Sequence, residues 1–181
     1  MSAPLAIRPA TLADIGAPRE LQVMAMRTLG AGYYTPAEVE AALRCVCVPD
    51  RELVEEGTYL IAELHGRLVG CGGWSLRRKH YAGPADHETD DERLDHLTEP
   101  TRIRAMFTAP DVARRGVGRA ILAAAENAAR AAGSSSARLG ATRSGEGFYR
   151  RSGYVEIARE GAPLPDGTAI AVVLMAKDLV S

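Results

Sequence analysis

A stretch rich in glycine and arginine lies between a predicted strand and a predicted helix. The strand is Arg102–Thr108, and the helix runs from about Gly116 to Ala132 with apolar residues along one face. Amides in the first helical turn have no intrahelical acceptor, and a glycine at position 118 lets an anion approach the main chain closely. Three arginines accompany the glycines: Arg114, Arg115 and Arg119. The stretch therefore predicts a site for an anion such as a diphosphate.

Two common phosphate-binding loops do not fit this stretch. The Walker motif, with its Gly-Lys-Ser/Thr ending, is absent. The dinucleotide fingerprint needs a third glycine, and the chain has Ile121 there, with no well-placed acid for a ribose. A helix start that is rich in arginine and glycine but binds no ligand remains the alternative at this point.

The other predicted elements form a mixed α/β sheet with one parallel crossover. Thr35–Glu38 is a capping box that opens a helix through about Leu43. In Arg102–Thr108, alternation predicts Ile103, Ala105 and Phe107 on one face. The remaining predictions are strands at 5–10, 58–64, 67–74, 137–142, 154–158 and 170–175, and helices at 14–29 and 146–152.

Composition limits the class of protein. A length of 181 residues suits a single domain, 1–181, and a net charge of -1 argues against a general nucleic-acid binder. There is no apolar run of membrane-spanning length and no secretory leader pattern, so we expect a cytoplasmic protein without membrane association. Cys45 and Cys47 have no partner motif, so no metal site is expected.

Several motifs resemble the GNAT superfamily of N-acetyltransferases. Arg115–Ala120 matches that family's Arg/Gln-x-x-Gly-x-Gly/Ala signature, and Gly147–Tyr154 is similar to its Phe-Tyr-x-x-x-Gly-Phe/Tyr element. Met106–Asp111 stands where the family's fourth strand ends, and Ile7–Asp14 looks like its opening strand and helix. The resemblance implies the GNAT fold, an α/β fold whose mixed, mostly antiparallel sheet has splayed central strands and flanking helices.

The resemblance also implies acetyl-coenzyme A as co-substrate. The amides of the signature would hold its diphosphate, and the end of the fourth strand would offer main-chain groups to the pantetheine arm. Arg114 or Arg119 would meet the 3′-phosphate. The cofactor-binding residues implied are Phe107, Thr108, Ala109, Arg114, Arg115, Gly116, Val117, Gly118, Arg119 and Ala120.

Acetyl transfer to an amine needs a base for the amine and an acid for the departing thiolate. The family's Phe-Tyr pair implies Tyr149 as that acid; the alternative is that Tyr149 packs at the sheet edge and only binds the coenzyme. The base stays open. Its candidates are His80, Tyr81, Glu88 and Glu99, and no one of them is favoured.

The expected function is acetyl transfer from acetyl-coenzyme A to a primary amine of a small molecule or peptide. The alternatives are a non-catalytic acyl-coenzyme A sensor or regulatory module and, more weakly, a nucleotide-dependent oxidoreductase. The acidic run Asp86–Glu92 would attract a cationic amine or be a solvated loop, and Trp74 would line the acceptor pocket or pack in the core. The oligomeric state stays open, and only base rates favour a homodimer.

Overall fold

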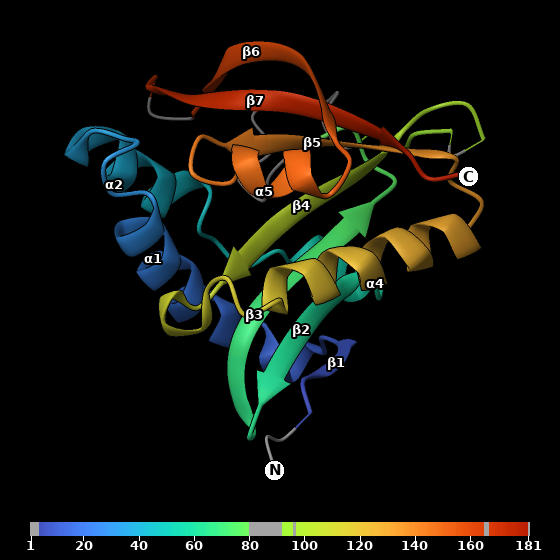
Figure 1. Cartoon of the computed structure of the whole chain (residues 1–181), viewed down its shortest axis with the longest axis horizontal. Helices are drawn as coiled ribbons and strands as arrows, with labels where there is room; N and C mark the ends of the chain where they lie inside the picture. The colour runs from blue at the N-terminus through green and yellow to red at the C-terminus, as the bar shows by residue number, and fades with distance from the viewer. Residues whose placement is uncertain (1–3, 80–91, 96, 165–166, 181) are drawn as a thin grey trace.

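Seven strands form one mixed sheet in the order β1-β2-β3-β4-β5-β7-β6 (Figure 1). The computed structural model describes residues 4–79, 92–95, 97–164 and 167–180. Neighbouring strands are antiparallel except β4 and β5, which are parallel and joined through a helix. The strands are β1 Ala6–Pro9, β2 Tyr59–Leu64, β3 Arg67–Ser75, β4 Thr101–Thr108, β5 Ser136–Thr142, β6 Val155–Pro163 and β7 Ala169–Asp178.

Helices cover both faces of the sheet. The helix α4 packs on β2, β3 and β4 from one face, while α1 packs on β3 and β4 from the other. The α-helices are α1 Ala17–Leu29, α2 Pro36–Cys45, α3 Arg51–Glu55, α4 Val117–Ala131 and α5 Glu146–Arg151, and short 3-10 turns are η1 Leu12–Asp14 and η3 Pro110–Val112. The predicted α/β fold and its single parallel crossover are therefore confirmed.

Local sequence signals predicted most of these elements. The capping box before α2 is formed, because the Thr35 amide donates to Glu38 Oε2 at 2.7 Å and the Glu38 amide donates to Thr35 Oγ1 at 3.3 Å. The first helix begins at Ala17 rather than near Asp14, because η1 forms a separate turn. The five-residue α3 was not predicted, since so short a segment has no readable period.

A bulge in β4 changes which of its side chains share a face of the sheet. Cys71 pairs with Phe107 but Gly73 pairs with Arg104, so the register shifts between them, and Ala105 has a φ of 57°. Ile103 packs in the cluster beneath α4, whereas Phe107 contacts the cluster beneath α1 and α2. The prediction that Ile103, Ala105 and Phe107 share a face is therefore wrong, because the extra residue reverses the alternation.

The glycines of β3 let α4 lie close to the sheet. A Cβ on Gly70 would lie 2.7 Å from Cδ1 of Ile121 and 2.9 Å from Cγ1 of Val117, both on α4. These distances are shorter than real carbon contacts. Close packing of α4 on β3 fixes where the first turn of that helix stands relative to β4.

The strands β4 and β5 separate soon after they begin, which confirms the splayed centre of the sheet. Their parallel pairing consists of Thr101 with Ala137 and Arg102 with Arg138. Beyond these pairs the two strands diverge toward their C-terminal ends (Figure 1). Main-chain groups on the facing edges of β4 and β5 are therefore free of each other along most of both strands.

A buried ionic cluster ties the middle of β4 to α3. The Arg104 side chain is fully buried, and its Nε lies 3.0 Å from Oδ2 of Asp50. It also contacts the Glu52 carboxylate. Asp50 in addition caps α3 by accepting from the Leu53 amide at 3.2 Å.

Replacing Asp50 by alanine should lower the free energy of unfolding by about 3–5 kcal/mol, because Arg104 would lose a buried partner and α3 its cap. Urea unfolding followed by circular dichroism measures this change. The matched control is Arg51→Ala in the same helix, whose exposed contact with Glu55 should contribute nothing measurable. An equal loss in both variants would contradict the structural importance of the buried cluster.

Across the residues that the structure describes, no helix has the length and apolar character needed to cross a membrane.

Candidate active site

At the end of β4, the main chain of Thr108 faces the gap between β4 and β5. The Ala109 amide donates to the Val69 carbonyl at 2.9 Å, and Phe107 lies opposite Cys71, so both face β3. Main-chain groups alternate in direction along an antiparallel ladder. The Thr108 amide and carbonyl between them therefore face the β5 side. Of the three strand residues predicted to meet the pantetheine arm, Thr108 has the main-chain groups that point into the gap.

The first turn of α4 offers unused amides beside that strand end. Gly116 is the N-cap with a φ of 88°, a conformation that glycine adopts at little cost. Within the described part of the chain, the amides of 116–119 have no acceptor. The Arg115 amide donates to the Val112 carbonyl and the Ala120 amide to the Gly116 carbonyl, so these two are already used. Of the six amides of Arg115–Ala120 that were predicted to hold the diphosphate, four are therefore still available.

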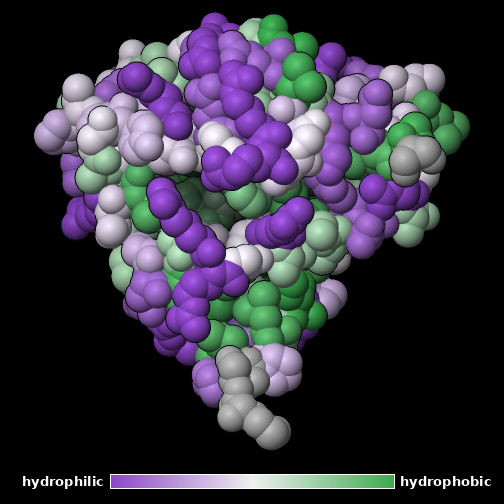
Figure 2. Space-filling model, viewed as in Figure 1, coloured by the Kyte–Doolittle hydropathy of each residue, from purple (hydrophilic) through white to green (hydrophobic). Residues whose placement is uncertain are grey.

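Positive charge surrounds these amides. Arg114, Arg115 and Arg119 are exposed, and none forms an ion pair with a residue that the structure describes. Figure 2 shows the surface hollowed between the part of the molecule that carries β5 and α5 and the part that carries α4, with hydrophilic residues around the hollow. Free amides, a helix N-terminus and nearby guanidinium groups together favour an anion.

Gly118 stands where three segments meet. A Cβ at this position would lie 3.3 Å from Oγ1 of Thr108 and 3.6 Å from Cζ of Phe148. Phe148 is therefore half-buried against the start of α4. Its ring packs against the core cluster and also borders the same gap as Thr108.

The helix α5 holds Tyr149 in the core between β4, β5 and β7. Its side chain is 8% exposed and meets the Phe148 and Tyr154 rings edge to face, with centroids 4.9 and 5.7 Å away. Burial raises the pKa of Tyr149 above its ordinary value. The phenol is therefore protonated throughout the neutral range, as a proton donor must be.

Of the four predicted bases, the structure describes only Glu99. This residue precedes β4, at the end of the strand opposite Thr108, and the eight residues of β4 place these two ends about 23 Å apart. Its carboxylate accepts from Arg78 at 2.8 Å. His80, Tyr81, Glu88 and all but the last residue of the predicted acidic run lie outside the described residues.

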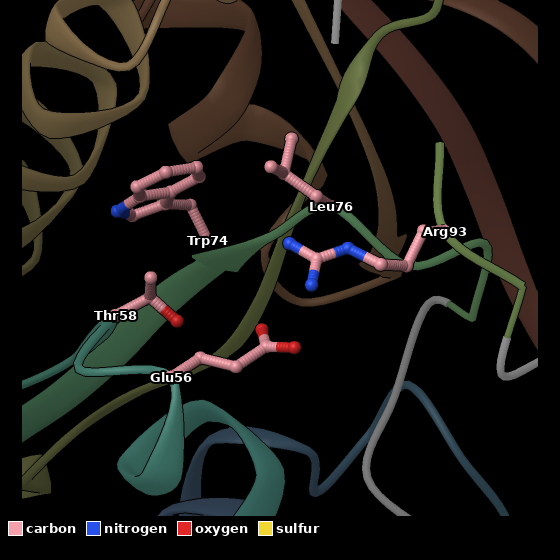
Figure 3. A pocket seen from close by; sticks show the side chains of 5 residues that line it. All are labelled: Glu56, Thr58, Trp74, Leu76 and Arg93. Carbon is pink, nitrogen blue, oxygen red and sulfur yellow. The ribbon is translucent and has the colours of Figure 1, made fainter. Parts of the chain in front are cut away.

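Trp74 both packs in the core and lines a cavity. Its ring belongs to the cluster beneath α4, opposite Ile103. It also forms a wall of a cavity of about 370 Å³ with Glu56, Thr58, Leu76 and Arg93 (Figure 3). Both sequence interpretations of Trp74 are therefore compatible with its place.

Tyr34 forms long-range hydrogen bonds that no sequence motif predicts. Its hydroxyl joins the turn between α1 and α2 to β7 and to the loop before α5, through Ala171 and Arg143. The Arg143 guanidinium donates to the Tyr33 carbonyl at 3.3 Å. Within the described ranges, no group of three or more His, Cys, Asp or Glu side chains is placed to hold a metal ion.

Solved structures show the same fold. A GCN5-related N-acetyltransferase from Rhodopseudomonas palustris is 23% identical over 98% of both chains, with a TM-score of 0.71. The PaiA N-acetyltransferase from Thermoplasma acidophilum, solved with coenzyme A, is 16% identical over 97% of this chain and 99% of its own, with a TM-score of 0.68. The protein yncA from Salmonella typhimurium, solved with its cofactor acetyl-CoA, is 17% identical over 99% and 96%, with a TM-score of 0.63.

The family assignment comes from the sequence itself. No curated protein matches the chain. The model of the Acetyltransferase (GNAT) domain family matches residues 55–156, which is more than half of the chain and includes both α4 and α5. The protein therefore belongs to the GNAT family and is an acetyl-CoA-dependent acetyltransferase.

Proposed function

We propose that the protein transfers an acetyl group from acetyl-CoA to a primary amine by direct attack. The observation that carries the proposal is the set of four unused amides at 116–119, which lie beside the free edge of β4 and among three exposed arginines. Two proteins of the same fold were solved with coenzyme A or acetyl-CoA. The diphosphate would bind these amides, and the 3′-phosphate would meet Arg114 or Arg119.

The pantetheine arm would then run along β4 from the α4 end. Thr108 would exchange main-chain hydrogen bonds with it, as an added strand does. Phe107 and Ala109 offer the arm less, because the Phe107 main chain and the Ala109 amide face β3. The Ala109 carbonyl already accepts from the Val112 amide at 3.1 Å. This course leads the acetyl end toward the place where β4 and β5 begin to separate.

The chemistry requires two proton transfers. The neutral amine attacks the thioester carbonyl carbon, a C–N bond forms, and the C–S bond then breaks. Tyr149 would give its phenolic proton to the leaving thiolate and regain one from solvent. The proton of the amine would leave to a base or through water, since a free alkylamine of pKa about 10.4 is mostly charged at neutral pH.

A non-catalytic acyl-coenzyme A sensor was the alternative that the sequence left open, and the family assignment argues against it. Such a module would bind acetyl-CoA equally well but would release no coenzyme A in the presence of amines.

A panel of amines tests both candidates. Butylamine, phenethylamine, spermidine, lysine and a peptide with a free alanine N-terminus would each be incubated with the protein and acetyl-CoA, while thiol release is followed. Amine-dependent thiol release supports the proposed enzyme. Tight coenzyme binding by calorimetry without release over the whole panel would favour the sensor.

A further inference from the structure

The two halves of the sheet meet through only two residue pairs of β4 and β5, so other contacts must set the angle between them. On the α4 face, the Lys177 ammonium lies 2.8 Å from the buried Glu126 carboxylate, which joins β7 to α4. Arg130 of α4 also donates to the Leu179 carbonyl at 2.6 Å. On the opposite face of the sheet, Tyr34 makes the contact between the two halves.

On that opposite face, Tyr34 connects three segments that are far apart in the sequence. Its hydroxyl donates to the Ala171 carbonyl of β7 at 3.0 Å and accepts from the Arg143 amide at 2.8 Å. The side chain is 8% exposed and packs with Met26 of α1 and Ile170 of β7. One phenol thus uses both its proton and a lone pair to hold the second half of the sheet against the α1–α2 turn.

The Arg143 amide is the critical partner because it belongs to the loop that leads into α5. Arg143 comes directly after β5, and the loop ends at Gly145, the N-cap of α5. The Tyr149 amide donates to the Gly145 carbonyl at 3.2 Å, so the start of α5 and the tyrosine on it move together with this loop. The helix is also tied to β6, where Arg159 lies 2.7 Å from Glu146, so the loop fixes the start of α5 rather than the whole helix.

We propose that Tyr34 is a positioning residue that places Tyr149 relative to β4 by holding the β5–α5 loop. This inference rests on the proposed role of Tyr149 as the proton donor. The amides at the start of α4 make no contact with Tyr34 among the described residues, so the effect falls on the chemical step and not on coenzyme binding.

The test is a double-mutant cycle between Tyr34→Phe and Tyr149→Phe. Thiol release from acetyl-CoA is measured with the panel amine that reacts fastest, or with water as acceptor if none reacts. Tyr34→Phe should lower kcat about tenfold in the native background and less than twofold in the Tyr149→Phe background, because an effect exerted through Tyr149 cannot be lost twice. The acetyl-CoA dissociation constant should stay within about twofold.

Two further measurements separate positioning from general damage. Hydrogen exchange of the Arg143 amide should become faster in Tyr34→Phe, because the amide loses its acceptor. The control is Tyr33→Phe, whose exposed side chain should leave kcat and exchange unchanged.

Each outcome decides the proposal. Equal losses of kcat from Tyr34→Phe in both backgrounds, or unchanged protection of the Arg143 amide, would overturn the positioning role while leaving Tyr149 as donor. If Tyr149→Phe alone has no effect on kcat, the donor role fails and the positioning role fails with it. A thermal midpoint close to that of the native protein keeps the comparison valid.

Discussion

Gly118→Glu should weaken acetyl-CoA binding at least about 100-fold, which corresponds to about 2.7 kcal/mol. Position 118 lies in the first turn of α4, where the amides of 116–119 have no acceptor among the described residues. A carboxylate there would both repel the diphosphate and compete with it for those amides. Calorimetric titration with acetyl-CoA measures the loss directly.

The variant should still fold. A carboxylate in the first turn of a helix is favourable to the helix itself. The new Cβ would lie 3.3 Å from Oγ1 of Thr108, a tight contact that a small shift of the hydroxyl relieves. Circular dichroism and the thermal midpoint establish that the loss of binding is local.

A matched control separates position from charge. Ala123→Glu adds the same side chain to an exposed site further along α4, away from the free amides, and should change acetyl-CoA affinity by no more than about twofold. Normal acetyl-CoA binding by Gly118→Glu, or an equal loss in both variants, would show that the diphosphate does not bind at the start of α4.

Local signals in the sequence were sufficient for the elements that frame this site. The glycines at 116 and 118 and the arginines around them predicted the start of α4, because a helix N-terminus depends on residues next to each other in the chain. The alternating residues of 102–108 likewise predicted β4. The GNAT motifs were recognisable for the same reason, since each is contained within one short segment.

Contacts between distant segments could not be predicted in this way. The Tyr34 hydroxyl meets Arg143 and Ala171, which are 109 and 137 residues away, and Arg104 meets Asp50 across 54 residues. Arginine and aspartate occur far more often on a solvated surface than in a buried pair, and a tyrosine in the sequence gives no sign of which distant group its hydroxyl will meet. The bulge at Ala105 was missed because a non-glycine residue at positive φ leaves no compositional sign.

Tyr149→Phe should lower kcat about 100-fold and change the acetyl-CoA dissociation constant by no more than about twofold. General acid catalysis contributes about 10²–10⁴-fold, and a thiolate is an easy leaving group, so the lower end of this range applies. The ring stays in place because phenylalanine keeps the edge-to-face contacts with Phe148 and Tyr154. Steady-state kinetics and coenzyme titration measure the two quantities separately.

Tyr154→Phe is the matched control for that experiment. Tyr154 belongs to the same buried aromatic stack, and its hydroxyl lies near the Glu126 carboxylate without forming a hydrogen bond of normal geometry to a described residue. Removing that hydroxyl should therefore leave kcat unchanged, because the group takes no part in the reaction. Comparable losses of kcat in both variants would mean that the stack, and not the Tyr149 proton, limits turnover.

The pH dependence gives an independent check on the donor. Burial raises the pKa of Tyr149, so the protonated form that can donate persists above the ordinary tyrosine pKa of about 10. Below about pH 10, the titration of Tyr149 should therefore cause no decline in rate, and the pH profiles of the native protein and of Tyr149→Phe should have the same shape. A decline near pH 8 present in the native protein and absent from the variant would assign Tyr149 a lowered pKa, which its buried and apolar surroundings cannot produce.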